Sequence, residues 1–313
     1  MVIYHRIDDL EDISSSVLTI GTFDGIHRGH QEIISRTVRS AKQCKCPSVL
    51  ITFDPHPQHI LRKANHPVKL IITPLDYKIR LIRKLGIDFV LILPFDRQLA
   101  GISAEDFFNE VILRKFNPAK IIIGYDHHFG HKREGDKKFL FAKSQQHHFE
   151  LEVIPPVCDG TTTISSSAIR RAVELRDFDT ANRFLGYNFE LSGIVVPGKG
   201  RGKNLNFPTA NIQIIDKTIL KPAVGVYCVR VELDDMKLNG ACNIGYRPTF
   251  NEHLSHPLIE INIFESTIND LYGRILTVQF IKFVRDELKF ESPDQLVKQL
   301  IFDREFCLNL HEK

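Results

Sequence analysis

The sequence predicts an α/β domain built on a parallel sheet, followed by a mainly-β domain that ends in a helix. Three observations lead to this prediction. In the first half, apolar runs alternate with segments of helical periodicity, as in parallel strands joined by helices. After residue 186, apolar runs follow one another without helices between them, which favours an antiparallel sheet or barrel. The length of 313 residues suits two domains, and we place them at 1–185 and 186–313.

The elements of the first half are predicted from apolar runs and from helix signals. Strands are expected at residues 17–20, 48–53, 87–93 and 119–123. Helices are expected at residues 31–43 and 75–85, the second ending at Gly86, and another begins at Ser103 with acidic residues in its first turn. Two further helices, at residues 167–175 and 177–185, end the first domain.

The elements of the second half are predicted in the same way. Strands are expected at residues 189–196, 224–233, 240–246, 258–264 and 275–284. The tail is predicted to be helical because Ser292 suits the N-cap, Pro293 the first helical position, and Gln295 a capping box.

The composition limits the possible classes of function. Hydrophobic residues make up 43% and charged residues 25% of the chain, which is ordinary for a globular protein, and the net charge of +3 is too small to indicate nucleic-acid or membrane binding. No run of eighteen apolar residues or signal peptide is found, so we expect a cytoplasmic protein. The six cysteines are scattered without zinc spacing, and we expect reduced structural thiols. The paired histidines at 127–128 and 147–148 are not expected to bind a metal.

The most informative motif runs from Gly21 to His30, between an apolar strand and a helix. Glycines allow the backbone to approach a ligand, and a helix start offers unpaired N–H groups that favour phosphate. A lone His-x-Gly-His would fit a solvated surface turn. Ten matching residues in a strand–turn–helix context instead predict a phosphate site.

Three more segments are candidates for the same site. Residues 51–57 end a strand in a proline-rich turn, residues 122–130 follow another strand, and residues 164–170 open a helix with serines and Arg170. Taken alone, the first would be a plain turn, and the serines would be ordinary N-caps. Ligands in parallel sheets bind beyond the carboxyl ends of strands, where these segments can meet.

Together, these segments resemble the FAD synthetase module of the nucleotidylyltransferase superfamily, which has a Rossmann-like parallel sheet. The resemblance implies adenylylation of FMN by ATP, with His27 and His30 as catalytic residues and Mg²⁺ as bridging charge. It assigns ATP binding to Gly21, Phe23, Asp24, Gly25, His27, Gly29, His30, Ser165, Ser166, Ser167 and Arg170. It assigns flavin binding to Phe53, Pro55, His56, Pro57, Asp126, His127 and Phe129. His127 stands where the family often has phenylalanine, and Ser167 replaces a usual threonine.

The second motif is Gly198–Asn211, which combines glycines with three basic residues. It lacks the spacing of a Walker A loop, and its basic residues alone would also fit a surface hairpin that contacts nucleic acid. Thr209 and Asn211 offer hard oxygen ligands, which suit magnesium. Glu260 lies between isoleucines on a strand, so strand alternation points it away from them, where it could act as a general base. An isolated strand glutamate is more commonly a surface residue.

This half resembles riboflavin kinase, in residues 241–250, 271–273 and 283–290 as well as the motif. The resemblance implies a barrel with Glu260 as the catalytic base and with Thr209 and Asn211 on Mg²⁺. It places ATP or flavin at Gly198, Lys199, Gly200, Arg201, Lys203, Phe207, Pro208, Asn243 and Arg285. Lys203, Asn206 and Asn262 depart from the residues that are common in the family.

From end to end, the chain resembles the bacterial bifunctional riboflavin kinase/FAD synthetase family. The resemblance implies that domain 186–313 phosphorylates riboflavin to FMN with ATP, and that domain 1–185 converts FMN and ATP to FAD and pyrophosphate. The alternatives are a nucleotidylyltransferase for another phosphorylated acceptor, or a flavin- or RNA-binding sensor without catalysis. We expect small-molecule substrates, no nucleic-acid or membrane partner, and a monomer or weak homo-oligomer. Rates and the transfer of FMN between sites are left open by the sequence.

Overall fold

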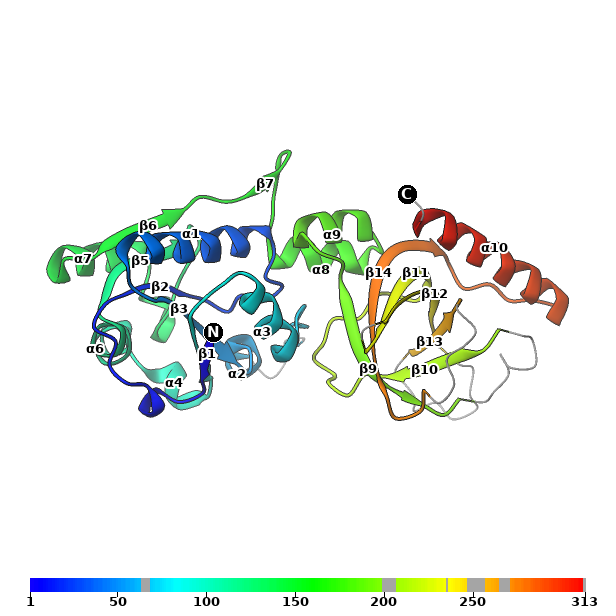
Figure 1. Cartoon of the computed structure of the whole chain (residues 1–313), viewed down its shortest axis with the longest axis horizontal. Helices are drawn as coiled ribbons and strands as arrows, with labels where there is room; N and C mark the ends of the chain where they lie inside the picture. The colour runs from blue at the N-terminus through cyan, green and yellow to red at the C-terminus, as the bar shows by residue number, and fades with distance from the viewer. Residues whose placement is uncertain (63–67, 199–206, 235, 247–256, 265–270, 312–313) are drawn as a thin grey trace. The chain divides into compact units, whose positions relative to one another are not determined.

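The computed structural model describes residues 1–62, 68–198, 207–234, 236–246, 257–264 and 271–311. The chain divides into two compact units, Met1–Ser166 and Ser167–Lys313 (Figure 1). The helices between residues 166 and 185 are therefore grouped with the second unit, although the sequence assigned them to the first domain. The boundary between the two activities, placed at 185–186, stays a prediction.

The first unit is built on a six-stranded sheet whose strand pairs are all parallel. The strand order is β1-β4-β3-β2-β5-β6. The bounds are β1 Val2–Tyr4, β2 Ser16–Ile20, β3 Ser48–Asp54, β4 Phe89–Pro94, β5 Pro118–Gly124 and β6 Glu150–Ile154. The predicted parallel sheet is confirmed. Strands β1 and β6 were not predicted, because one has three residues and the other carries glutamates at alternate positions.

Alternate residues of these strands face different hydrophobic clusters. Leu18 and Ile121 pack with the helical segment of residues 104–116, whereas Val17 and Ile122 pack with Ala41 of α1, Arg28–Cys44. Both faces of the sheet are therefore covered, which explains why its central strands are apolar without alternation.

The remaining elements of the first unit are short or lie at its surface. They are α2 Pro57–Leu61, α3 Leu75–Lys84, α4 Arg97–Gly101, α5 Ala104–Phe107, a π-helical turn Phe108–Leu113, α6 Arg114–Phe116, α7 Lys137–His147 and the hairpin β7 Cys158–Asp159 with β8 Thr162–Thr163. As predicted, α3 is followed by Gly86 with a positive φ of 85°, and Ser103 caps α5 through a hydrogen bond from the backbone N–H of Asp106.

The second unit contains a closed antiparallel barrel in the order β10-β13-β12-β11-β14-β9. The bounds are β9 Glu190–Val196, β10 Thr209–Gln213, β11 Gly225–Leu233, β12 Met236–Gly245, β13 Leu258–Ile263 and β14 Ile275–Arg285. The predicted barrel is confirmed. Strand β10 was not predicted as a strand, since its polar residues carry no clear strand signal, yet it closes the barrel between β9 and β13.

Helices α8, Ser166–Glu174, and α9, Phe178–Leu185, precede the barrel, and α9 contributes to its core. The ring of Phe178 stacks on Phe280 at 5.3 Å between centroids and meets Tyr227 edge-on at 5.5 Å. The side chain of Asn182 donates to the carbonyl oxygen of Phe280 at 2.9 Å and accepts from the N–H of Phe189 at 2.8 Å. The barrel is therefore completed by residues that precede it in the chain.

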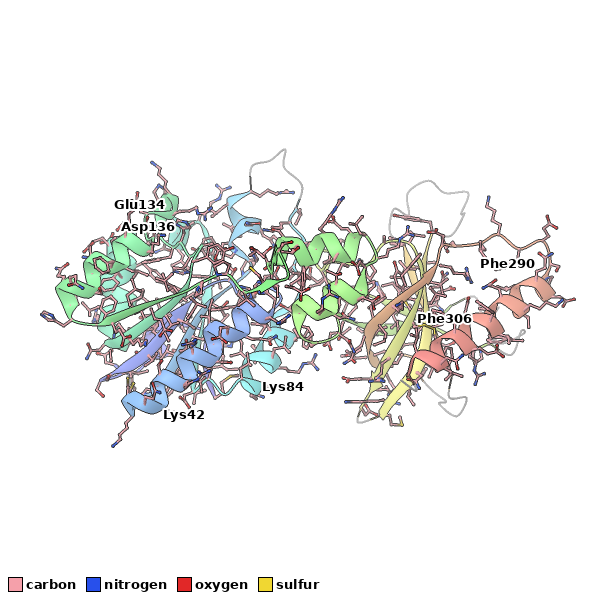
Figure 2. The ribbon with its side chains drawn as sticks, turned by 90° about the horizontal axis from the view of Figure 1, so that it is seen from above. Lys42, Lys84, Glu134, Asp136, Phe290 and Phe306 are labelled. Carbon is pink, nitrogen blue, oxygen red and sulfur yellow. A yellow bond between two sulfur atoms is a disulfide. The ribbon has the colours of Figure 1, made fainter. Side chains whose placement is uncertain are left out.

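The C-terminal helix α10, Pro293–His311, packs against the barrel and is linked to it by a disulfide. It begins as predicted, with Ser292 accepting a hydrogen bond from the N–H of Gln295 at 3.3 Å. Phe306 packs against the cluster of Cys228, Phe264 and Cys307 (Figure 2). A disulfide joins Cys228 of β11 to Cys307, so the expectation of reduced thiols is wrong for this pair. Spacing could not predict it, because 79 residues separate the two cysteines.

No helix within the described part of the chain is long and apolar enough to cross a lipid bilayer.

Candidate functional site

The first candidate site lies where the parallel sheet changes direction. Successive strands β2, β3 and β4 extend to one side, and β5 and β6 extend to the other side of β2. At such a point the loops that follow neighbouring strands separate, leaving a crevice beyond their carboxyl ends. The Gly21–His30 turn follows β2, Phe53 lies at the carboxyl end of β3, and Asp126 follows β5. The topology therefore brings three of the predicted segments to one edge of the sheet.

The Gly21–His30 turn has an unusual backbone conformation. Phe23 and Ile26 have positive φ angles of 48° and 34°, although neither is glycine, and Gly25 has φ of 89°. Both side chains are buried, Phe23 at 3% and Ile26 at 1% exposure. A Cβ at Gly29 would lie 3.2 Å from the His27 ring, so glycine allows the close approach there. A backbone held in sparsely populated conformations by its surroundings is typical of ligand-binding turns.

His27 and His30 form one stacked pair, as the motif predicted. Their ring centroids are 3.7 Å apart at an interplanar angle of 18°, and the Nδ1 atom of His27 accepts from the N–H of His30 at 3.4 Å. Burial lowers the pKa of His30 well below its usual 6.5, and the charges of His27 and Lys78 lower it further. Nδ1 of His30 is buried and makes no hydrogen bond to the described residues. His30 is therefore a neutral imidazole at pH 7, with an unsatisfied polar atom at the helix start.

Two of the predicted ATP-binding residues brace the turn. The Oδ1 atom of Asp24 accepts from the N–H of Ile72 at 2.8 Å and of Thr73 at 3.3 Å. The hydroxyl of Ser166 donates to the carbonyl oxygen of Asp24 at 2.8 Å. Ser165 precedes Ser166, and Ser167 and Arg170 lie on α8 in the second compact unit.

The predicted flavin-binding residues differ in their surroundings. The ring of Phe53 meets Phe95 edge-on at 5.6 Å, and His56 caps α2, with Pro55 before it and Pro57 in its first turn. Phe129 belongs to the hydrophobic core and is only 7% exposed. His127 is half-buried and lies 5.8 Å from the Phe129 ring, and Asp126 is exposed. Phe129 thus supports His127 from the core, and its own ring has little free surface.

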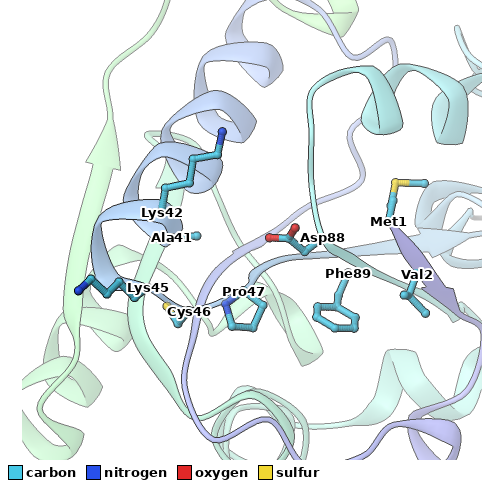
Figure 3. A pocket seen from close by; sticks show the side chains of 9 residues that line it. All are labelled: Met1, Val2, Ala41, Lys42, Lys45, Cys46, Pro47, Asp88 and Phe89. Carbon is cyan, nitrogen blue, oxygen red and sulfur yellow. The ribbon is translucent and has the colours of Figure 1, made fainter.

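A separate pocket of about 530 Å³ lies at the opposite edge of the sheet, near the amino ends of the strands (Figure 3). Lys42, Lys45 and Asp88 contribute to its lining. The carboxylate of Asp88 already accepts from the N–H and hydroxyl of Ser48 at 2.9 and 2.6 Å. None of the predicted site residues lines this pocket.

The second candidate site is a row of three polar residues across the barrel. Glu260 of β13 lies opposite Asn211 of β10 on one side and Asn243 of β12 on the other. Residues directly opposite each other share one face of a sheet, so the three side chains are neighbours. Ile259 and Ile261 are buried on the other face at 4% and 0% exposure, as strand alternation predicted.

Glu260 and Asn243 also line a small pocket of about 50 Å³ together with Tyr246 and Glu287. Asn243 donates to Glu287 at 3.4 Å. Arg285, predicted to contact ATP or flavin, binds Asp303 of α10: its Nε lies 3.1 Å from both carboxylate oxygens, and its Nη2 lies 2.7 Å from one of them. Asp303 is only 1% exposed, so this guanidinium holds the helix that follows the site.

The predicted magnesium ligands lie on β10 beside this row. Thr209 and Asn211 are two residues apart on one strand and therefore share a face. A hydroxyl and an amide oxygen beside the Glu260 carboxylate are a hard donor set, which fits Mg²⁺ that is also bound by phosphates. A Cβ at Gly198 would lie 2.1 Å from the amide nitrogen of Asn211, so glycine is required for this approach. Phe207 and Pro208 lead into β10, whereas Lys199, Gly200, Arg201, Lys203 and Asn206 lie outside the described residues.

Two residues near these sites were not singled out by sequence reasoning. Lys78 is buried under the Gly21–His30 turn, and Glu287 closes the pocket at Glu260. A signal for Lys78 existed, because it shares the apolar face of its helix with Leu81 and Ile82. Glu287 lies in the segment that resembles riboflavin kinase, but only the fold shows that it turns back to Asn243.

Comparisons with known proteins identify two families, one in each half of the chain. A model of the FAD synthetase family matches residues 9–168, and a model of the riboflavin kinase family matches residues 185–311. The chain is 34% identical to the bifunctional riboflavin kinase/FMN adenylyltransferase of Buchnera aphidicola from Acyrthosiphon pisum, over 97% of this chain and 96% of that protein. It is 33% identical to the protein of the same description from Bacillus subtilis, over 94% and 92%, and 34% identical to that of Escherichia coli K12, over 92% and 90%.

A solved structure also shares the fold of the whole chain. It is a Streptococcus pneumoniae protein described as a macrolide-efflux protein, with a TM-score of 0.87, 32% identity and coverage of 98% of both chains. Its description names another activity, but the matches to the two enzyme families cover residues 9–168 and 185–311 of this chain. The chain belongs to the family of bifunctional riboflavin kinases/FMN adenylyltransferases.

Proposed function

We propose that this protein phosphorylates riboflavin to FMN in its barrel and adenylylates FMN to FAD at its parallel sheet, using ATP in both steps. The observation that carries the proposal is the presence of two separate sites, each with its own reactive groups. His27 and His30 lie at the switch point of the sheet, and Glu260 lies between Asn211 and Asn243 on the barrel.

At the sheet, the phosphate of FMN attacks the α-phosphorus of ATP. A bond forms between an FMN phosphate oxygen and this phosphorus, the bond to the β-phosphate bridging oxygen breaks, and pyrophosphate leaves. The FMN phosphate is already ionised near pH 7, so catalysis depends on positioning and on stabilising charge. His27 and the neutral His30 donate hydrogen bonds to the phosphates as charge moves to pyrophosphate. The lowered pKa of His30 supports this role as a neutral donor.

At the barrel, a ribityl hydroxyl of riboflavin attacks the γ-phosphorus of ATP. Glu260 accepts the hydroxyl proton, an oxygen–phosphorus bond forms, and ADP leaves with the bridging oxygen. Asn211 and Asn243 lie directly opposite Glu260 on the two neighbouring strands. Mg²⁺, held through Thr209 and Asn211, would supply the positive charge that neutralises the ATP phosphates.

The surroundings of the protein are also part of this proposal. Both reactions use soluble metabolites, so we propose a cytoplasmic enzyme that acts as a monomer or weak homo-oligomer. It needs no nucleic-acid or membrane partner for either reaction.

One chromatographic experiment tests the proposal. The purified protein is incubated with riboflavin and MgATP, and FMN and FAD are separated and quantified. His30→Ala is expected to lower FAD formation by on the order of a hundredfold while FMN accumulates, because one stabilising donor at the transition state is lost. Glu260→Gln keeps the size of the side chain but removes the base, so FMN formation is expected to stop while supplied FMN is still converted to FAD.

Matched variants separate these effects from general damage. His131→Ala changes an exposed histidine in the first unit, and Glu232→Gln changes a glutamate elsewhere in the barrel. Both are expected to keep both activities. FAD synthesis at the wild-type rate by His30→Ala would contradict the assignment of the first site, and riboflavin phosphorylation at the wild-type rate by Glu260→Gln would place the base elsewhere.

A further inference from the structure

A buried lysine lies beneath the turn that carries the histidine pair. Lys78 is 6% exposed and shares the inner face of α3 with Leu81 and Ile82, which are 9% and 0% exposed. Removing an ammonium group from water costs several kcal/mol unless partners compensate for the loss. The Nζ atom of Lys78 donates to the carbonyl oxygen of Thr22 at 3.0 Å. The helix therefore presents a cation to the backbone of the Gly21–His30 turn.

Donors from other segments bind several carbonyl groups of this turn. The carbonyl oxygen of Thr22 accepts from Lys78 and, at 3.2 Å, from the hydroxyl of Thr52. The carbonyl oxygen of Asp24 accepts from Ser166 at 2.8 Å, and that of Ile26 accepts from the side chain of Gln31 at 2.8 Å. These hydrogen bonds fix the course of the backbone between Thr22 and Ile26.

The turn needs this support because of its conformation. Phe23 and Ile26 have positive φ angles, which are costly for residues with a Cβ. The backbone unit of Thr22 immediately precedes Phe23, so fixing its carbonyl oxygen fixes the entry to the strained segment. Lys78 and Thr52 hold that oxygen from two elements, α3 and β3.

Two carboxylates interact with the ammonium, one from the Gly21–His30 turn and one from the end of β3. Burial lowers the pKa of Lys78, while the carboxylates of Asp24 and Asp54 raise it. Asp24 is itself bound to the N–H groups of Ile72 and Thr73, so it stays in place as a neighbour of the cation. Burial lowers the pKa of His30 most, and the charges of His27 and Lys78 lower this pKa further. The lysine thus influences both the backbone and the histidine of the site.

We propose that Lys78 is a positioning residue for adenylyl transfer, which acts through the Thr22 carbonyl oxygen to hold the Gly21–His30 turn and its histidine pair in the conformation that stabilises the transition state. The proposal rests on the proposed function of this site. In this proposal, Lys78 acts on the backbone of the turn through its hydrogen bond to Thr22 and makes no bond to the substrates.

Three variants test the proposal in the full-length protein. Lys78→Met keeps a long side chain on the helix but removes the donor, and Thr52→Val removes the second donor to the same oxygen while keeping the shape. Lys143→Met is the matched control, because Lys143 is a lysine of the same unit that is 9% exposed and paired with Glu105, away from the turn. For each variant, kcat and KM for FMN and for MgATP are measured together with riboflavin phosphorylation and the thermal transitions.

The expected result is a loss in kcat rather than in substrate binding. Lys78→Met should lower kcat for adenylylation by about 30-fold or more, and each KM should change less than about fivefold. The reason is that, without Lys78, the turn is no longer held in the conformation that stabilises the transition state. Thr52→Val should lower kcat about threefold, and the double variant should lose less than the product of the two losses, since both donors share one acceptor. Lys78→Arg should restore part of the rate. The melting temperature of Lys78→Met should fall, because the buried Asp24 carboxylate loses a neighbouring cation, so kcat is measured well below the thermal transition of the variant.

The other outcomes overturn the proposal. If Lys78→Met keeps its adenylylation kcat within twofold of the wild-type value, Lys78 does not position the turn. If both Lys78→Met and Lys78→Arg lose the folded first unit, while riboflavin phosphorylation remains, Lys78 is only structural. If the wild-type protein makes no FAD from FMN and MgATP, the proposed function of the site fails, and this result is distinct from the first two.

Discussion

Acidification should destabilise the first unit through His127, and replacing this residue by phenylalanine should remove the effect. Burial lowers the pKa of His127 from 6.5 to about 4, and the charge of His128 adds to this shift. The Nε2 atom of His127 is buried without a hydrogen bond to the described residues, and its ring lies on Phe129. The folded protein therefore keeps this imidazole neutral in a pH range where the unfolded chain binds a proton.

The direction and size of the effect follow from this difference in proton binding. Above pH 6.5 both states are neutral at this position, so the stability contribution is fully present. As the pH falls from 6.5 towards 4, the unfolded chain is protonated first, and stability is lost. For a folded pKa of about 4, the loss is about 2 kcal/mol at pH 5 and about 0.1 kcal/mol at pH 7.5, which are upper values because His127 is only half-buried.

His127→Phe keeps an aromatic ring against Phe129 but cannot be protonated. The assay is urea unfolding followed by far-ultraviolet circular dichroism at pH 5 and pH 7.5, because the chain has no tryptophan for fluorescence. We compare the free energy of unfolding of the first unit in the variant and in the wild type. The difference, variant minus wild type, should increase by up to about 2 kcal/mol when the pH is lowered from 7.5 to 5. His5→Phe, the same change at an exposed histidine, is the control and should show no such gain. A difference between His127→Phe and wild type that is the same at both pH values would refute the reasoning.

Three further predictions concern the second unit. Cys307→Ser, or reduction of the wild type, should lower the free energy of unfolding of the barrel by up to about 4 kcal/mol, because the disulfide closes a loop across 79 residues. An unfolding transition of the barrel that reductant leaves unchanged would contradict this prediction. Asp303→Ala should cost about 3–5 kcal/mol in the same transition by leaving Arg285 without its carboxylate partner, and unchanged urea unfolding would argue that the pair is dispensable. A Tyr187–Lys313 fragment should still phosphorylate riboflavin, but should be about 3 kcal/mol or more less stable than Ser167–Lys313, since it lacks Phe178 from the aromatic core. Equal stability of the two fragments by calorimetry would contradict the role of α9.

Much of the site at the parallel sheet was predictable, because its signals are local. The strand before Gly21 and the helix after it are each encoded by neighbouring residues, and in a parallel sheet the loop after every strand lies at the same edge. The start of α10 is local in the same sense, since Ser292 and Gln295 are three residues apart. In such features, residues that are close in the sequence are also close in space, so the sequence pattern is enough to predict the contact.

Other features depend on pairings between distant residues, which no local pattern encodes. The sequence indicated that Glu260 points away from the barrel core, but only the strand register places it between Asn211 and Asn243. The assignment of Arg285 to substrate likewise could not anticipate Asp303 on α10 as its partner.

The sequence by itself determined the two kinds of architecture and the motifs to which we assign each reaction. Periodicity and turn residues are properties of short segments, and short segments form the same elements wherever they pack. The tertiary structure alone decided the Cys228–Cys307 disulfide, the contribution of α9 to the barrel core, and the position of Lys78 beneath the Gly21–His30 turn. Each of these joins residues far apart in the chain, and such contacts are fixed only when the packing of the whole unit fixes the distances between its elements.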